Sequence, residues 1–130
     1  MTKPTVLFLC VHNAGRSQMA LGWFQHLAGG AAIALSGGSE PAAALNPAVV
    51  AAMAEVGIDI TRNRPRQWTD TDLDAADVVV TMGCGDACPY VPSKRYEDWP
   101  LDDPAGQPID RVRPIRDEIK QHVEQLLDTL

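Results

Sequence analysis

The residues best suited to chemistry form one segment near the start of the chain, Cys10-Val11-His12-Asn13-Ala14-Gly15-Arg16-Ser17. The segment follows a short apolar run and precedes a helical pattern, so several backbone N–H groups and a helix N-terminus should face one concavity that holds an oxyanion. Arg16 would add a planar pair of N–H donors that matches two oxygens of a tetrahedral anion. The same positive field favours the thiolate form of Cys10, which predicts a nucleophile beneath the anion.

The other residues of this loop are predicted to support the nucleophile and the turn. The Ser17 hydroxyl is expected to donate a hydrogen bond to the sulfur, Asn13 to bond neighbouring backbone, and Gly15 to allow a tight turn. The alternative is an ordinary strand-to-helix turn with a buried thiol, which leaves the cysteine, five-residue spacer, arginine and serine unexplained. The predicted anion-binding residues are Val11, His12, Asn13, Ala14, Gly15 and Arg16.

Two further cysteines, Cys84 and Cys88, follow a run of valines. In a reducing compartment, clustered cysteines are more often catalytic or metal-binding than structural. Zinc binding is one alternative, but Cys-x-His is a cramped ligand spacing and this alternative leaves Arg16 and Ser17 without a role. Its four nominal ligands are Cys10, His12, Cys84 and Cys88.

Strand and helix patterns alternate along the chain, which predicts an α/β fold with a mainly parallel sheet and helices on both faces. Pro114 is expected to start or kink the last helix, which is amphipathic from Ile115 onward. The segment 61–74 predicts a surface loop and a short helical turn, with its three arginines on a solvated face. The expected strands are 5–10, 31–36, 77–82 and, at an edge, 94–97, and the other expected helices are 16–28 and 46–56.

Length and composition narrow the function classes. The 130 residues predict one domain, 1–130, and the net charge of −6 argues against nucleic acid or anionic membrane as a partner. The apolar stretches are too short to span a bilayer, and the N-terminus lacks the pattern of a signal peptide. We therefore expect a cytoplasmic protein.

Cys-x5-Arg-Ser after the first strand resembles the low-molecular-weight protein tyrosine phosphatase superfamily. The stretches Asn13 to Ala20, Gly57 to Ile60 and Asp102 to Gly106 are similar to its thioredoxin-coupled arsenate reductase branch. The likeness covers almost the whole chain. It implies a four-stranded parallel sheet in the order 2-1-3-4, with the active loop after strand 1.

The resemblance also implies a reaction. Cys10 would attack arsenate while Asp103 protonates the departing oxygen, and phosphate or sulfate would mimic the substrate. Cys84 would then attack Cys10, and Cys88 would attack Cys84, leaving a disulfide for thioredoxin or a low-molecular-weight thiol to reduce. Which of Cys84 and Cys88 attacks first stays open, as does the choice between a monomer and a weak homodimer. No cofactor or metal is expected.

Some positions depart from the family pattern. The spacing between Cys84 and Cys88 is shorter than in the familiar reductases, and His12 stands where glycine is common. Some relatives hold a potassium ion with residues matching Asn13 and Ser36, but Leu21 replaces their acid, so no such ion is expected. The alternative function is a phosphatase acting on phosphate monoesters, which needs neither later cysteine. Against it, Ala105 follows the Asp-Pro pair where that branch usually has an aromatic residue.

Overall fold

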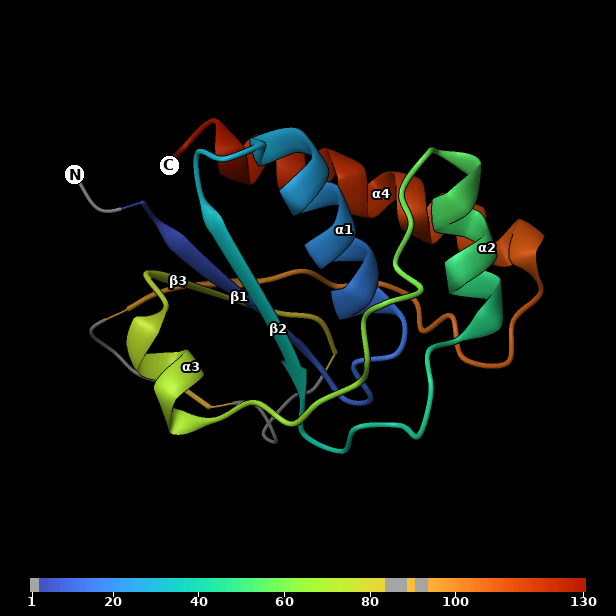
Figure 1. The fold of residues 1–130 in the computed structure, drawn as a ribbon, viewed down its shortest axis with the longest axis horizontal. Coiled ribbons are helices and arrows are strands. Elements are labelled where there is room, and N and C mark those ends of the chain that lie inside the picture. The colour runs from blue at the N-terminus through green and yellow to red at the C-terminus, as the bar shows by residue number, and fades with distance from the viewer. Residues whose placement is uncertain (1–2, 84–88, 91–93) are drawn as a thin grey trace.

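The computed structural model describes residues 3–83, 89–90 and 94–130. At its centre lies a parallel four-stranded sheet in the order β2-β1-β3-β4 (Figure 1), which confirms the expected strand order. The two outer strands are partly exposed, whereas the two central strands are almost entirely buried. The strands are β1 (Thr5–Cys10), β2 (Ile33–Gly38), β3 (Val78–Thr81) and β4 (Arg95–Asp98).

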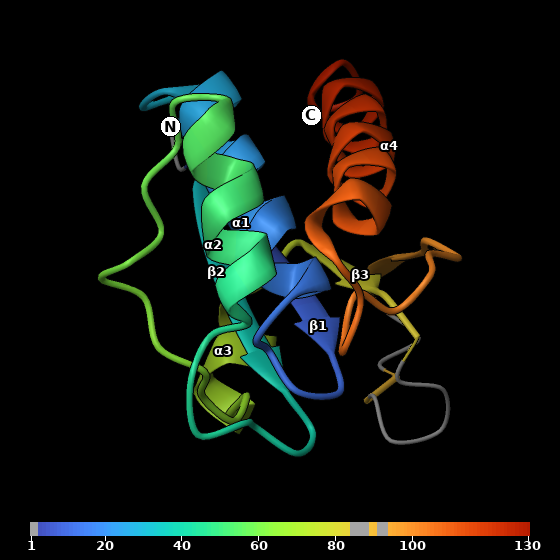
Figure 2. The same cartoon turned by 90° about the vertical axis from the view of Figure 1, so that its right-hand side faces the viewer.

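Helices cover both faces of the sheet. Three of them, α1, α2 and α4, gather on one face, and the short helix α3 lies on the other (Figures 1 and 2). None of the helices in the described ranges combines the length and the hydrophobicity that a bilayer span requires. The helices are α1 (Arg16–Ala28), α2 (Pro47–Glu55), α3 (Asp70–Ala75) and α4 (Ile109–Leu127).

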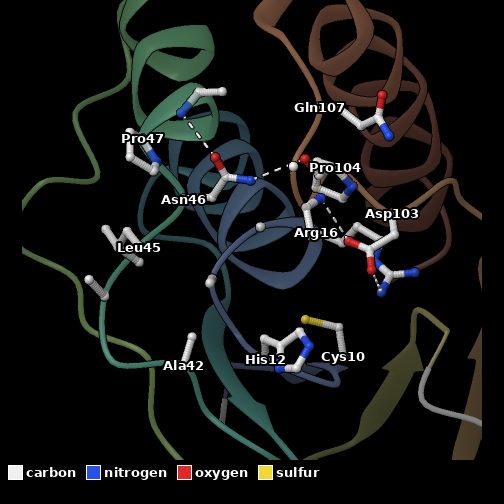
Figure 3. Close-up of a pocket in the computed structure, with 16 residues that line it drawn as sticks. Cys10, His12, Arg16, Ala42, Leu45, Asn46, Pro47, Asp103, Pro104 and Gln107 are labelled. Carbon is white, nitrogen blue, oxygen red and sulfur yellow. Dashed lines mark hydrogen bonds and ion pairs between the residues drawn. The ribbon is translucent and has the colours of Figure 1, made fainter.

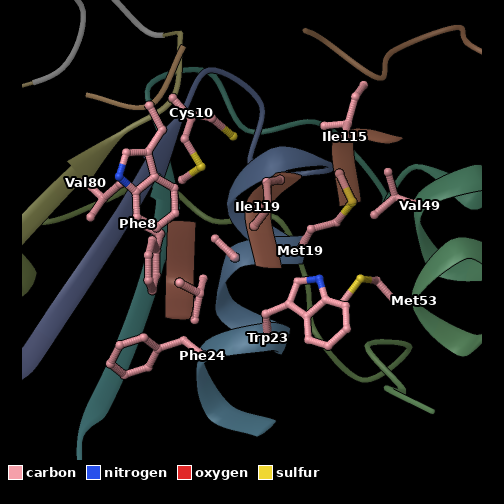
Figure 4. Packing of buried hydrophobic residues seen from close by; sticks show 14 of the residues in the cluster. Phe8, Cys10, Met19, Trp23, Phe24, Val49, Met53, Val80, Ile115 and Ile119 are labelled. Atoms are coloured by element: carbon pink, nitrogen blue, oxygen red, sulfur yellow. The ribbon is translucent and has the colours of Figure 1, made fainter. Parts of the chain in front are cut away.

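The strand β1 is buried along its whole length because alternate side chains enter two different cores. Val6, Phe8 and Cys10 join the larger core with α1, α2 and α4 (Figure 4). Leu7 and Leu9 join the smaller core on the side of α3. The nucleophile candidate therefore ends a strand that is fixed from both sides.

The strand β2 begins and ends two residues later than its apolar run predicts. It pairs with β1 from Thr5 opposite Ile33 to Cys10 opposite Gly38, so the length of β1 sets its limits. Its last residues are glycines because other backbone comes very close. A Cβ on Gly38 would lie 2.6 Å from the carbonyl oxygen of Val11, in the candidate loop.

The helix α4 begins six residues before Ile115, at Ile109, and so the prediction that Pro114 starts it is wrong. Pro114 lies inside the helix and is exposed. A proline lacks the N–H that would bond the carbonyl four residues earlier, so the helix loses one backbone hydrogen bond at this position. Burial of Ile115 and Ile119 in the main core compensates for that loss.

Candidate active site

The candidate loop leaves the carboxyl end of β1, where β1 is flanked by β2 and β3. In parallel α/β sheets such a position collects ligands. The helix α1 starts at Arg16 after Gly15, which offers no side-chain cap, and its first turn contains no acidic residue. The positive end of the helix is therefore left for an external anion.

Cys10 is a buried free thiol, 3% exposed, at the base of this loop. Its Sγ lies 2.8 Å from Ser17 Oγ, on the first turn of α1. Ser17 Oγ also accepts a hydrogen bond of 2.7 Å from Asn13 Nδ2. Because the hydroxyl has one proton and Asn13 occupies a lone pair, that proton is free to point at the sulfur. This arrangement suits an ionised sulfur, which accepts hydrogen bonds.

Asn13 adopts a left-handed backbone conformation with φ of 51° and is fully buried. Its Oδ1 accepts hydrogen bonds from the backbone N–H of Arg66 at 3.0 Å and from Gln18 Nε2 at 3.2 Å. These two donors fix which end of the amide faces Ser17. Asn13 thus bonds the backbone of a distant segment as well as its own loop.

The Arg16 guanidinium is buried between two segments beside the loop. Nη1 donates to the carbonyl of Leu101 at 3.3 Å, and Nη2 lies 3.7 Å from Asp103 Oδ2. Gly83 has a φ of 81°, and a Cβ at that position would overlap the guanidinium. The side chain therefore lies where the chain leaves β3 and where the Asp103 loop passes.

Asp103 is half exposed, and its Oδ1 accepts a hydrogen bond of 3.0 Å from the Ala105 N–H. The next residue, Pro104, packs directly on the candidate loop: a Cβ on Gly15 would lie 2.7 Å from Pro104 Cγ. Asn46 Nδ2 also donates to the Pro104 carbonyl at 3.2 Å. These contacts hold Asp103 across the pocket from Cys10.

A pocket of about 540 Å³ opens above the loop (Figure 3). His12 lines it, and His12 Nδ1 lies 3.0 Å from the carbonyl oxygen of Glu40. Since a carbonyl oxygen only accepts, Nδ1 carries the proton and Nε2 is the other ring position available to a ligand. Small apolar side chains form the outer wall, namely Ala42, Ala44, Leu45, Pro47, Ala48 and Ala105.

The structure thus brings Cys10, Arg16, Ser17 and Asp103 to one pocket and its immediate surroundings. Cys84 and Cys88 lie outside the described residues, and with them the disulfide relay and the nominal zinc set. Within the ranges that the structure does describe, no three His, Cys, Asp or Glu side chains are grouped to hold a metal ion.

Two contributors were missed by the sequence reasoning. Asn46 caps α2 by accepting from the Ala48 N–H at 3.0 Å while it bonds Pro104, and its place before Pro47 is a readable cap signal. Arg66 is the second: its side chain is 45% exposed, as expected for a solvated arginine face, but it also makes specific contacts. Its guanidinium donates to the Ser36 carbonyl and to Asp72 Oδ2, each at 2.7 Å.

Together, the fold and the loop define a class of protein: an α/β domain with a cysteine nucleophile at the base of an oxyanion-binding loop. The family model described as low molecular weight phosphotyrosine protein phosphatase matches residues 5–130, and the chain belongs to this family.

Several relatives resemble the chain over nearly its full length. It is 43% identical over 128 residues to arsenate reductase 2 of Staphylococcus epidermidis, covering 95% of this chain and 96% of the relative. A putative arsenate reductase of Halobacterium salinarum is 39% identical over 127 residues, covering 93% of this chain and 89% of the relative.

Solved structures show the same likeness. The thioredoxin-dependent arsenate reductase Cg_ArsC1' of Corynebacterium glutamicum superposes with a TM-score of 0.86 and 42% identity over 98% of this chain. The present chain spans 61% of the length of that protein. An arsenate reductase in the phosphate binding state gives a TM-score of 0.87 and 35% identity, covering 97% of this chain and 98% of the other.

Proposed function

We propose that this chain reduces arsenate to arsenite, in arsenic detoxification, with Cys10 as the nucleophile. The observation that carries the proposal is the buried Cys10 Sγ, 2.8 Å from Ser17 Oγ, in a pocket that Arg16 and Asp103 also line. The relatives named as arsenate reductases supply the choice of oxyanion.

The anion would be bound by the loop backbone and by Arg16. Amide groups of residues 11–16 and the uncapped start of α1 would hold the oxygens, with the guanidinium drawn from Asp103 onto the anion. His12 would add a contact through Nε2. Phosphate and sulfate have the same shape and would occupy this position, as the similar structure in a phosphate binding state suggests.

In the first step the Cys10 thiolate attacks arsenic in line with one hydroxyl oxygen. A sulfur–arsenic bond forms, the arsenic–oxygen bond breaks, and the Asp103 proton leaves with that oxygen as water. Ser17 and Asn13 hold the sulfur in position. Arsenic is still pentavalent in this adduct.

The second step transfers the electrons. The Cys84 thiolate attacks Cys10 Sγ, a disulfide forms, and the electron pair of the sulfur–arsenic bond stays on arsenic, which departs as arsenite. Cys88 then attacks Cys84 and releases the Cys10 thiolate. Gly83, immediately before Cys84 in the sequence, lies against the Arg16 guanidinium, which supports a relay beside the anion.

The remaining disulfide between Cys84 and Cys88 would be reduced by thioredoxin, with a low-molecular-weight thiol as the alternative reductant. The name of the similar thioredoxin-dependent enzyme supports the first choice. A relay of this kind needs a reducing compartment, which favours a cytoplasmic location. The oligomeric state that we propose is a monomer or a weak homodimer.

The test replaces Cys84 and Cys88 separately with serine. Arsenate turnover is followed by NADPH oxidation with thioredoxin and thioredoxin reductase, and hydrolysis of p-nitrophenyl phosphate is followed in parallel. Loss of the first activity with survival of the second supports the relay, whereas arsenate turnover that survives both replacements contradicts it. Cys10→Ser is the control that should abolish both activities.

Hydrolysis of phosphate monoesters is the second candidate function. The pocket, at about 540 Å³, extends well beyond the loop and ends in an apolar wall, so an ester group has room. The same nucleophile and acid would serve through a phosphocysteine. A kcat/KM for aryl phosphates far above that for arsenate would favour this function over the first.

A further inference from the structure

Arg66 lies outside the pocket, yet it is hydrogen-bonded to the network that reaches the sulfur of Cys10. Its backbone N–H donates to Asn13 Oδ1 at 3.0 Å across 53 residues of sequence. Asn13 Nδ2 donates to Ser17 Oγ, which lies 2.8 Å from Cys10 Sγ. The orientation of the Asn13 amide therefore links Arg66 to the nucleophile.

The backbone of Arg66 is itself held in place. Its carbonyl accepts a hydrogen bond of 2.9 Å from the Gly38 N–H at the end of β2. Its guanidinium donates to the Ser36 carbonyl on the same strand and to Asp72 Oδ2 on α3, each at 2.7 Å. In Figure 1 the segment before α3 passes the carboxyl end of β2, where these contacts are made. One residue thus joins β2, α3 and the anion loop.

Asp72 is the ion-pair partner of this guanidinium. Burial alone would raise the pKa of its carboxyl group, but hydrogen bonds from the Thr69 N–H and hydroxyl and from Arg66 outweigh burial and hold the pKa below its usual value. The carboxyl group is only 12% exposed and stays ionised at neutral pH. The Thr69 and Asp72 pair also forms the capping box of α3.

Asn13 needs this support. It is the one non-glycine residue in the described ranges with a positive φ, a conformation that surrounding contacts must maintain. If Arg66 moved away, Oδ1 would keep only Gln18 Nε2 as a donor, and the amide would be less firmly directed at Ser17.

We propose that Arg66 is a positioning residue for the Cys10 thiolate, acting through Asn13 and Ser17, with its ion pair to Asp72 fixing the position of its N–H. This inference rests on the proposed role of Cys10 as the nucleophile. It assigns Arg66 no contact with substrate, because Arg66 does not line the pocket. Loss of its side chain should lower the reactivity of the sulfur and leave anion affinity nearly intact.

The experiment compares Arg66→Gln with Arg64→Gln in the full chain. Arg64 lies on the same loop, and within the described part of the chain no hydrogen bond or ion pair of its side chain is found, so it is a matched control. Alkylation of Cys10 by iodoacetamide is followed against pH by mass spectrometry of the Cys10 peptide. The kcat and KM for p-nitrophenyl phosphate are measured on the same samples.

Arg66→Gln should lower the alkylation rate at neutral pH and kcat by about three- to tenfold, the effect of one weakened hydrogen bond, with KM little changed. Asp72→Asn should act in the same direction. Arg66→Lys should fall between the wild type and Arg66→Gln, because an ammonium group cannot match two acceptors in the fork geometry of a guanidinium.

An Arg66→Gln protein with the alkylation profile and kcat of Arg64→Gln would overturn the inference. If circular dichroism shows that Arg66→Gln is unfolded, Arg66→Lys decides: wild-type alkylation and kcat overturn the proposal, and reduced values at unchanged KM support it. A wild-type Cys10 no more reactive than free cysteine would instead contradict the proposed function, and the inference with it.

Discussion

Replacement of Ser17 by alanine tests the thiolate geometry most directly. The change removes the oxygen 2.8 Å from Cys10 Sγ and opens little space in this fully buried position, because only a hydroxyl group is lost. A hydrogen bond to a charged group contributes about 1.5–3 kcal/mol. The alkylation rate of Cys10 at neutral pH should therefore fall about tenfold to a hundredfold.

The same replacement has a second, separable consequence for stability. Asn13 Nδ2 loses its acceptor and becomes a buried unpaired donor, which should lower the free energy of unfolding by about 1–3 kcal/mol. Urea denaturation at neutral pH measures this loss, and iodoacetamide alkylation against pH measures the first effect in the folded protein.

Ser39 provides a matched control for the serine replacement. Its backbone N–H donates to the Cys10 carbonyl at 3.3 Å, so it lies beside the loop. Its hydroxyl oxygen is also buried, but has no hydrogen-bond partner among the described residues. Ser39→Ala should leave both measurements near wild type. A Ser17→Ala protein that alkylates like Ser39→Ala at every pH would refute the argument that the Ser17 hydroxyl stabilises the ionised sulfur.

Two further predictions concern the acid and the helix pair α2 and α4. Asp103→Asn should lower kcat for arsenate by about 10²- to 10⁴-fold, while an aryl phosphate whose leaving group needs no proton should suffer far less; equal losses would contradict the role of general acid. Hydrogen bonds from Arg113, and in addition from Arg116, lower the pKa of Glu55 from 4.5 to about 2. The ionised carboxylate therefore stabilises the fold fully above pH 4.5, and this contribution is lost as the pH falls through about 2. Thermal unfolding should show Glu55→Gln less stable than wild type at pH 7, with the difference shrinking below pH 4.5, and a difference independent of pH would contradict the ion-pair argument.

The fold was predictable from sequence where a single element decides the pattern. The apolar runs of β1 and β3 and the Gly29 that ends α1 are local signals, and each appears in the structure near its expected place. The limits of β2 were not predictable in this way because pairing with β1 sets them. The start of α4 was missed because burial of Ile115 and Ile119 outweighs the unfavourable Pro114.

The residues of the candidate site likewise fall into those with a local sequence signal and those whose role depends on distant contacts. Residues 10–17 are contiguous, so their types and spacing are enough to indicate an oxyanion loop. Asn46 carries a cap signal, but its bond to Pro104 joins positions 58 residues apart, and no local pattern reports such a contact. Arg66 is exposed like Arg62 and Arg64 and differs from them in its hydrogen bonds to Ser36 and Asp72, which no local pattern reports.

The loop sequence therefore specifies a nucleophile without specifying how strongly it is held. Asn13 reaches Ser17 in a left-handed backbone conformation, and donors outside residues 10–17 hold its side-chain amide in place. One of these donors is a backbone N–H, which every residue type except proline can supply, so the sequence at that position carries no trace of the role. What sequence does record is the side chain that fixes this N–H, the Arg66 guanidinium on Asp72. Chains with the same Cys-x5-Arg-Ser segment should accordingly differ in thiolate reactivity according to what anchors the donor to Asn13.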